Sequence, residues 1–208
     1  ARFNSLPFPI RNAGRLISVD PETLMRQGTE FFGSGNHTNK KGKIKPLAEM
    51  QVVKTGRVDI LAMKTTPCFT REEGDGSRST LAMPYGGGVN RFRDRSADHL
   101  IAPGEIHLNP RNGGSVSVGY FSGLIITIEH CQLARTIQAM GGNQSLPKIG
   151  VSVVIKDEIR NKSAGIHGRF WSFFRYMDQL LGEGKNLPVA MGLDEQIYRL
   201  LAIALFEQ

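Results

Sequence analysis

Histidine and carboxylate spacing is the first place to look for a metal site in this chain. One recurrent site in β-barrels uses two histidines one residue apart, then a glutamate and a further histidine on a neighbouring strand. No two of the five histidines here have that spacing. His99 and His107 flank a predicted strand, and Glu105 lies two residues before His107, which is a weak ligand pattern. We therefore expect no specifically bound metal ion and no cofactor.

The sequence also lacks the arrangements that activate a nucleophile. It contains no Gly-x-Ser-x-Gly elbow. Cys68 has no histidine partner indicated by spacing. The glycine run at residues 86–88 lacks the spaced lysine and the following helix of a phosphate loop, so a tight turn explains it better. We expect no catalytic residue and no enzymatic activity.

Three arginines alternate along one predicted strand at residues 91–95. Side chains on a strand alternate between its faces, so the arginines share one face and Phe92 takes the other. The interpretation that we favour is a solvated outer face with Phe92 inward. The functional alternative is an anion-binding surface for a small effector, and a third is an approach to a DNA backbone. The candidate ligand-binding residues are Arg91, Arg93, Arg95 and His107.

Short strands and turns are predicted to position these residues. Residues 48–66 favour two strands with a bend at 54–56, and residues 80–85, 105–108, 115–121 and 123–128 favour further strands. The period then changes to that of a helix, with Leu133, Ile137 and Met140 at i, i+4 and i+7, ended by Gly141–Gly142. A strand meander that ends in a helix predicts a small β-barrel or jelly roll.

Two apolar helical stripes follow near the C-terminus, in residues 164–184 and 193–205. Phe170, Phe174, Met177 and Leu181 recur at i, i+4, i+7 and i+11 along the first stripe. Such a stripe is more often core than interface. A small barrel covers only part of two long helices, so we predict that these four residues form a dimer interface. Burial within one chain is the alternative.

Composition narrows the class of protein. The 208 residues are 40% hydrophobic and include 24 glycines, which suits a globular β-rich chain with many turns. No apolar run is long enough for a transmembrane helix, and the N-terminus lacks the apolar region of a signal peptide. The two cysteines are too few for a disulfide framework, so we expect a cytoplasmic location. The net charge of +7 permits an anionic partner.

Several motifs together resemble one known family. They are the Pro-Gly-Glu-Ile turn at 103–106, the strand that ends at Ser122–Gly123, the entry into a helix at 126–133, and the spacing of Asp194, Arg199, Leu200 and Leu201. This set is similar to the N-terminal regulatory domain of AraC/XylS-type transcription regulators, in the subclass with a degenerate cupin-like sensor.

The resemblance implies a domain organisation and a set of partners. It implies a cupin-like β-barrel sensor at residues 1–150 and a helical dimerisation segment at residues 151–208. DNA binding would belong to a C-terminal pair of helix-turn-helix units, which we expect to be absent from this chain. The expected partners are a second copy of the chain and a small-molecule effector, with no membrane. The alternatives are a cupin-fold enzyme and a protein-interaction module whose barrel is closed by large side chains.

Overall fold

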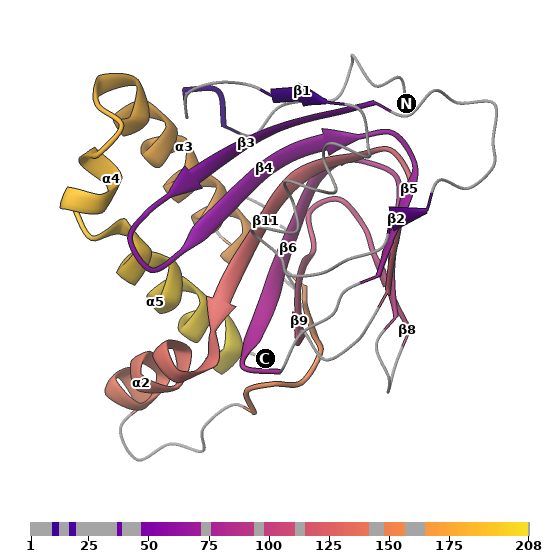
Figure 1. Ribbon diagram of the computed structural model, residues 1–208. Helices are drawn as coiled ribbons and strands as arrows, with labels where there is room; N and C mark the ends of the chain where they lie inside the picture. Colours follow the sequence, from indigo (N-terminus) through magenta and orange to yellow (C-terminus); the bar gives the residue numbers. More distant parts are fainter. Residues whose placement is uncertain are drawn as a thin grey trace.

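Antiparallel strands followed by C-terminal helices make up the described part of the chain (Figure 1). The computed structural model describes residues 10–12, 17–19, 37–38, 47–71, 76–93, 98–110, 115–141, 148–156 and 165–207. The strands are β1 Ile17–Val19, β2 His37–Thr38, β3 Ala48–Lys54, β4 Asp59–Thr65, β5 Cys68–Arg71, β6 Arg78–Gly87, β7 Asn90–Arg93, β8 Asp98–Ile101, β9 Ile106–Pro110, β10 Ser115–Val118, β11 Phe121–Glu129 and β12 Val153–Ile155. The helices are α2 His130–Gly141, α3 Ile166–Glu183, α4 Leu187–Ala190 and α5 Leu193–Phe206.

The strands form two sheets. The larger sheet has the order β1-β3-β4-β11-β6-β9-β12, and the smaller has the order β2-β5-β10-β7-β8. Figure 1 shows the helices beside one face of the larger sheet and the smaller sheet beside its other face. The predicted fold class is confirmed as mainly β with C-terminal α-helices, and the two facing antiparallel sheets agree with a barrel or jelly roll.

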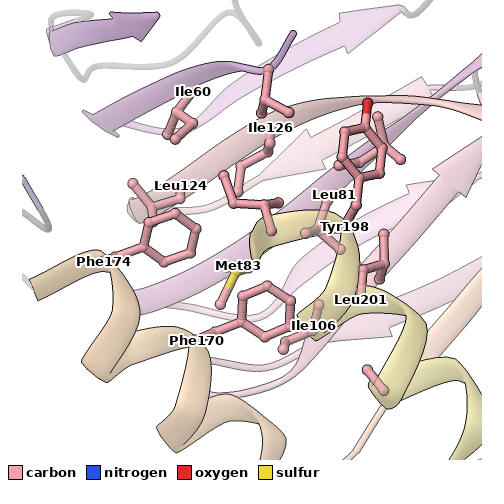
Figure 2. Close-up of a cluster of buried hydrophobic side chains, with 14 of the residues drawn as sticks. Ile60, Leu81, Met83, Ile106, Leu124, Ile126, Phe170, Phe174, Tyr198 and Leu201 are labelled. Atoms are coloured by element: carbon pink, nitrogen blue, oxygen red, sulfur yellow. The ribbon is translucent and has the colours of Figure 1, made fainter. Parts of the chain in front are cut away.

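One hydrophobic core joins the larger sheet to the helices (Figure 2). On β6, Leu81 and Met83 belong to this core, whereas Ala82 between them packs with Phe92 of the smaller sheet. Both faces of β6 are therefore buried, which explains why residues 81–85 are apolar without alternation. The core residues labelled in Figure 2 are Ile60, Leu81, Met83, Ile106, Leu124, Ile126, Phe170, Phe174, Tyr198 and Leu201.

The four residues predicted to form a dimer interface lie inside this core. Phe170, Phe174 and Met177 have no exposed surface in the single chain, and Leu181 is 7% exposed. A second chain cannot contact them unless α3 first leaves the sheet. The prediction of a dimer interface at these residues is therefore wrong. The alternative, burial within one chain, is correct, because the larger sheet of the same chain covers the apolar stripe of α3.

The predicted turn at Ser122–Gly123 is a β-bulge instead. β11 runs without interruption through these residues, and its pairing with β6 shifts register between them. A Cβ atom at Gly123 would lie 2.4 Å from the carbonyl oxygen of Met83, so only glycine fits where the strands approach. The chain turns earlier, between β10 and β11, where Gly88 N–H donates to the carbonyl of Tyr120 at 2.8 Å.

Most of the predicted helix boundaries agree with the structure. α2 ends at Gly141, with Leu133 and Ile137 buried, whereas Met140 is exposed. The segment between the long helices holds the short helix α4, with Pro188 in its first turn, where a missing N–H group costs no helical hydrogen bond. β12 follows residue 150 yet pairs with β9. The division of the chain at residue 150 stays a prediction.

Among the described helices, none has the length and apolar character needed to cross a membrane.

Candidate functional site

A row of polar side chains occupies the face of the larger sheet that points away from the helices. Thr127 of β11 lies opposite Thr80 of β6, and Thr80 lies opposite Asn109 of β9. Residues directly opposite each other share a face of the sheet. All three are buried, with at most 7% of their surface exposed. The row therefore lies in the interior between the two sheets, which we call the barrel interior.

A second group of interior residues brings the two sheets into contact. His107 lies opposite Ala82 in the register of β9 and β6. Its ring centroid is 4.6 Å from that of Phe92 and 5.2 Å from that of His99, two residues paired across β7 and β8. The Nε2 atom of His107 is 2.8 Å from the Oγ atom of Ser152. His107, a predicted ligand-binding residue, is thus fully buried in the barrel interior, and its role in binding stays a prediction.

Asn90 lies beyond this contact, on the side away from Thr80. It pairs with Ile101 of β8, and both are fully buried. The turn after Ile101 is fixed to the larger sheet, because the N–H group of Gly104 donates to the carbonyl of Pro84 at 2.9 Å. Pro84 and Thr80 lie toward opposite ends of β6. The barrel interior therefore has polar groups at both ends and an aromatic contact between them.

Several of these buried polar atoms have no hydrogen-bond partner within the described part of the chain. They are Oγ1 of Thr80, Oγ1 of Thr127, Oδ1 and Nδ2 of Asn90, and Nε2 of His99. A buried polar group without a partner costs about 1–3 kcal/mol. Native proteins usually satisfy such groups with ordered water or with a ligand. The concentration of these atoms in the barrel interior makes it the candidate binding site.

The predicted arginine site does not face this interior. Arg91 and Arg93 are exposed on the outer face of β7, whereas Phe92 between them is buried. The Nε atom of Arg91 lies 2.9 Å from the carboxylate of Asp98, and an Nη atom of Arg93 lies 3.1 Å from it. Hydrogen bonding to Arg91 is the largest cause that lowers the pKa of Asp98 below its usual range. These two arginines therefore do not line the barrel interior, Phe92 faces inward as the favoured interpretation expects, and the role of Arg91 and Arg93 in anion binding stays a prediction.

Arg95, the third arginine of that prediction, lies outside the described residues.

The barrel interior does not fit the metal ion that a cupin-type barrel implies. His99 and His107 supply two nearby imidazoles. The carboxylate of Glu105 has other partners. It lies 3.3 Å from Nζ of Lys156, and it accepts a hydrogen bond of 2.8 Å from the backbone N–H of Ala102. Across the described ranges, no three histidine, cysteine or acidic side chains converge on one point. Two imidazoles alone fall short of a metal-binding donor set, so we derive no chemistry through a metal.

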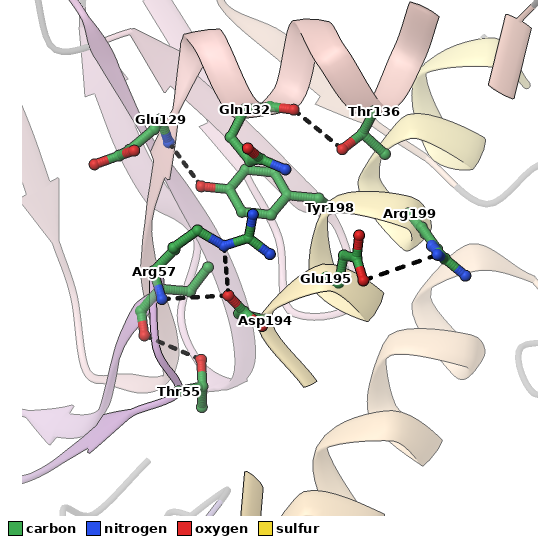
Figure 3. A network of polar contacts seen from close by, with 10 residues as sticks. Thr55, Arg57, Glu129, Gln132, Thr136, Asp194, Glu195, Tyr198 and Arg199 are labelled. Carbon is green, nitrogen blue, oxygen red and sulfur yellow. Dashed lines mark hydrogen bonds and ion pairs between the residues drawn. The ribbon is translucent and has the colours of Figure 1, made fainter. Parts of the chain in front are cut away.

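A polar latch fixes the β3–β4 hairpin to the start of α5 (Figure 3). The Nε atom of Arg57 donates to Oδ2 of Asp194 at 2.8 Å, and the backbone N–H of Arg57 donates to the same oxygen at 3.3 Å. Gly56, with φ of +87°, makes the bend, and a Cβ atom there would lie 3.2 Å from Oδ2 of Asp194. We call the Arg57–Asp194 contact the hairpin latch.

A second contact joins α5 to β11. The backbone N–H of Glu129, the last residue of β11, donates to the hydroxyl of Tyr198 at 3.2 Å. Tyr198 is fully buried, so its hydroxyl is held beside the point where β11 becomes α2. The first turn of α5 and this tyrosine therefore connect the helix to two separate places in the larger sheet.

Replacing Asp194 by asparagine should weaken the hairpin latch and change the pH dependence of stability. Burial alone would raise the pKa of Asp194, but hydrogen bonds from the side chain and backbone of Arg57 outweigh it, and the pKa is lowered. The ionised carboxylate therefore stabilises the fold above its ordinary pKa of 3.8, and this contribution is lost as the pH falls below that value. We expect the variant to lose about 1–2 kcal/mol at neutral pH, because the half-exposed Arg57 is partly screened by water.

Denaturant unfolding of both proteins across the acidic range measures this effect. The difference between wild type and D194N should narrow toward about pH 3. Glu195→Gln is the matched control, since Glu195 and Arg199 are 3.9 Å apart and both half exposed, and it should change stability little. A constant difference at all pH values would show that the charge of Asp194 is not what stabilises the contact.

Comparison with known proteins identifies a shared fold. No protein-family model and no curated protein matches the chain. Among solved structures, the chain is similar to the AraC-like transcriptional activator CuxR, with a TM-score of 0.57, 11% sequence identity, and coverage of 90% of this chain and 70% of that chain. The resemblance to AraC-type regulators predicted from the sequence is confirmed at the level of the fold.

Two weaker similarities accompany it. A putative ethanolamine utilization protein EutQ from Salmonella typhimurium LT2 gives a TM-score of 0.33 at 10% identity, covering 46% of this chain and 94% of that chain. Oxalate decarboxylase from Bacillus subtilis gives a TM-score of 0.31 at 11% identity, covering 54% and 28%.

The polar residues of the barrel interior were not identified from the sequence. Thr80 and Thr127 lie in apolar strands, where threonine is also a common strand former. Asn90 follows a glycine run, where asparagine is usual in turns. Alternation does place Thr80 on the face opposite Leu81 and Met83, but it does not show that both faces of β6 are buried. A signal for the site would have required knowledge of the second sheet.

Proposed function

We propose that this domain is the regulatory part of a cytoplasmic transcription regulator and that it binds a small-molecule effector in the barrel interior. The fold shared with an AraC-like activator supports the class. The observation that carries the binding proposal is the set of buried, unpartnered polar atoms on Thr80, Thr127 and Asn90. In this proposal, DNA contact belongs to a helix-turn-helix region outside the 208 residues.

The connections of α5 give such an effector a route to the rest of the molecule. Thr127 and Glu129 are two residues apart on β11, and Glu129 N–H bonds to Tyr198 of α5. An effector that hydrogen-bonds to Thr127 therefore binds the same strand end that holds α5. It would shift the position of α5 to the extent that it binds one arrangement of this strand end more tightly than another.

The proposal is tested by whether a compound binds without being converted. A compound that raises the Tm of the protein should be recovered chemically unchanged after long incubation, as expected of a sensor. The assay is thermal unfolding followed by mass spectrometry of the compound. Conversion of the compound by wild-type protein, lost in a Thr80→Val, Thr127→Val variant, would instead favour the cupin-fold enzyme. Failure of any compound to stabilise the protein would favour the interaction module.

We also propose that the domain forms a homodimer, through a surface other than the buried stripe of α3. Because the inner stripe of α3 is core, a homodimer that forms through the helices must use side chains that stay exposed. Tyr176, Val189 and Met191 are large apolar residues exposed by 43–49% on α3, α4 and the residue after α4. The hydroxyl of Tyr176 lies 3.9 Å from Sδ of Met191, so these two form one patch.

A further inference from the structure

A short N-terminal segment, residues 10–12, contacts both α3 and β3, and we call it the strap. We propose that the strap holds α3 on the larger sheet, and that its release lets α3 open while the strands stay folded. The strap would then act as a regulatory contact within the fold. This inference goes beyond the proposed function, because it concerns the helices and not the barrel interior.

One carboxylate on α3 holds the strap by its backbone. Oδ1 of Asp178 accepts hydrogen bonds from the N–H groups of Arg11, at 2.8 Å, and of Asn12, at 2.7 Å. The backbone carbonyl of Asp178 also accepts a bond of 3.1 Å from Nδ2 of Asn12. Hydrogen bonds to an ionised group are about twice as strong as bonds between neutral groups. Asp178 is therefore the polar anchor of the strap on α3.

The strap is also anchored in the core and on the sheet. Ile10 is fully buried, in the same hydrophobic core as Phe174 and Met177 of α3. On the other side, Nε2 of Gln51 in β3 donates to the carbonyl of Arg11 at 3.3 Å. The strap therefore connects the helix to the sheet through polar bonds to both and through one buried side chain.

These contacts are of the kind that opens locally. Arg11 and Asn12 are exposed, and water competes for the groups that bond them to Asp178. Ile10 is the one buried residue of the three. Segments with few buried apolar contacts and exposed hydrogen bonds open far more often than core strands do. β6 and β11 are such core strands, since each is paired on both sides.

Release of the strap gives a means to control the helices. A partner that captures residues 10–12 binds only the released state, so it shifts the population of α3 toward the open arrangement. The strap is therefore an autoinhibitory contact that keeps the apolar stripe of α3 covered. α3 also carries Tyr176 of the patch proposed for the homodimer, and an effect of the strap on that patch rests on the proposed function.

A disulfide between the strap and α3 tests this inference. A Cβ atom at Gly182 would lie 3.8 Å from Cβ of Asn12, close to the usual separation of the Cβ atoms in a disulfide. β1 begins five residues after Asn12 and is paired with β3, so the crosslink ties α3 to the larger sheet. The Asn12→Cys, Gly182→Cys variant, made together with Cys131→Ser to remove an exposed thiol, is locked by oxidation and released by reduction.

Hydrogen exchange across a series of low denaturant concentrations gives the readout. In the reduced form, α3 should exchange faster than β6 and β11 and with a weaker dependence on denaturant, because its opening exposes less surface than global unfolding. Oxidation should slow this exchange of α3 by at least about tenfold. Fast exchange of α3 that persists after oxidation would show that α3 opens without the strap. Identical exchange of α3 and the strands in the reduced form would show that no separate opening exists. Either result overturns the inference.

A second pair of variants tests the anchor without a crosslink. Asp178→Ala should speed the exchange of α3 by at least about tenfold, since loss of a hydrogen bond to a charged group shifts an opening equilibrium by about that factor. Gln179→Ala is the matched control, because Gln179 is the next residue on α3 and is exposed. Equal exchange of α3 in the two variants would contradict the role of Asp178 and, with it, the strap.

Discussion

Replacing Phe174 by alanine should lower the free energy of unfolding by about 3–5 kcal/mol. Phe174 has no exposed surface, and its ring lies 6.1 Å from that of Phe170 and 5.2 Å from that of Phe173. Figure 2 shows it pointing from α3 toward Leu124 of β11. The truncated side chain leaves a cavity at the junction of helix and sheet. Since a typical domain is stable by only 5–15 kcal/mol, this one change removes a large share of the stability.

The Phe174→Asp variant distinguishes a residue of the hydrophobic core from a residue of a dimer interface. A buried carboxylate without a partner should prevent folding, whereas a residue at a dimer seam would give a folded monomer. Met191→Glu is the matched surface change, because Met191 is half exposed. It should leave the Tm nearly unchanged, and in sedimentation it should weaken any dimer that uses the Tyr176–Met191 patch. A folded, monomeric F174D protein would restore the dimer seam on α3.

The second large effect concerns the unpartnered hydroxyls of the barrel interior. Changing both Thr80 and Thr127 to valine should raise the stability of the ligand-free protein by about 2–4 kcal/mol. Each hydroxyl is buried without a partner in the described residues, and removal of such a group relieves a cost of about 1–3 kcal/mol. The gain in stability should come with the loss of ligand binding, as is common when binding sites are made apolar.

Thr55 provides the control for this substitution. Its side chain is also fully buried, but its hydroxyl donates to the carbonyl of Val58 at 3.0 Å. Thr55→Val should therefore lower stability by about 1 kcal/mol. Chemical unfolding of the three proteins compares them directly. If the Thr80 and Thr127 changes destabilise the protein as the Thr55 change does, these hydroxyls are bonded in the native state and the interior is not a polar binding site.

The sequence predicted the elements better than it predicted their partners. The helical period identified the buried face of α3 correctly, because Phe170 and Phe174 are both core. Periodicity reports that a face is covered and does not report which surface covers it. Here the covering surface is the sheet of the same chain, whose central strands are far away in the sequence.

The alternation of strand residues likewise identified which face is buried, but not which residues lie beside it. Alternation placed Arg91 and Arg93 opposite Phe92, which is what the structure shows. It did not show that Asp98 of the next strand pairs with both arginines. At Gly123, a serine–glycine pair typical of a turn proved to be a bulge, because the close approach of β6 requires glycine there. Long-range packing decides such positions, and a single sequence does not contain it.

A high-resolution crystal structure of the wild-type protein, grown with a compound that raises its Tm, tests the central claim most directly. The account predicts density for the compound between the two sheets, within hydrogen-bonding distance of Oγ1 of Thr80 or Thr127, or of the Asn90 amide. A compound bound on the outer face beside Arg91 and Arg93, or an interior in which these polar atoms bond only to other protein atoms, would contradict it.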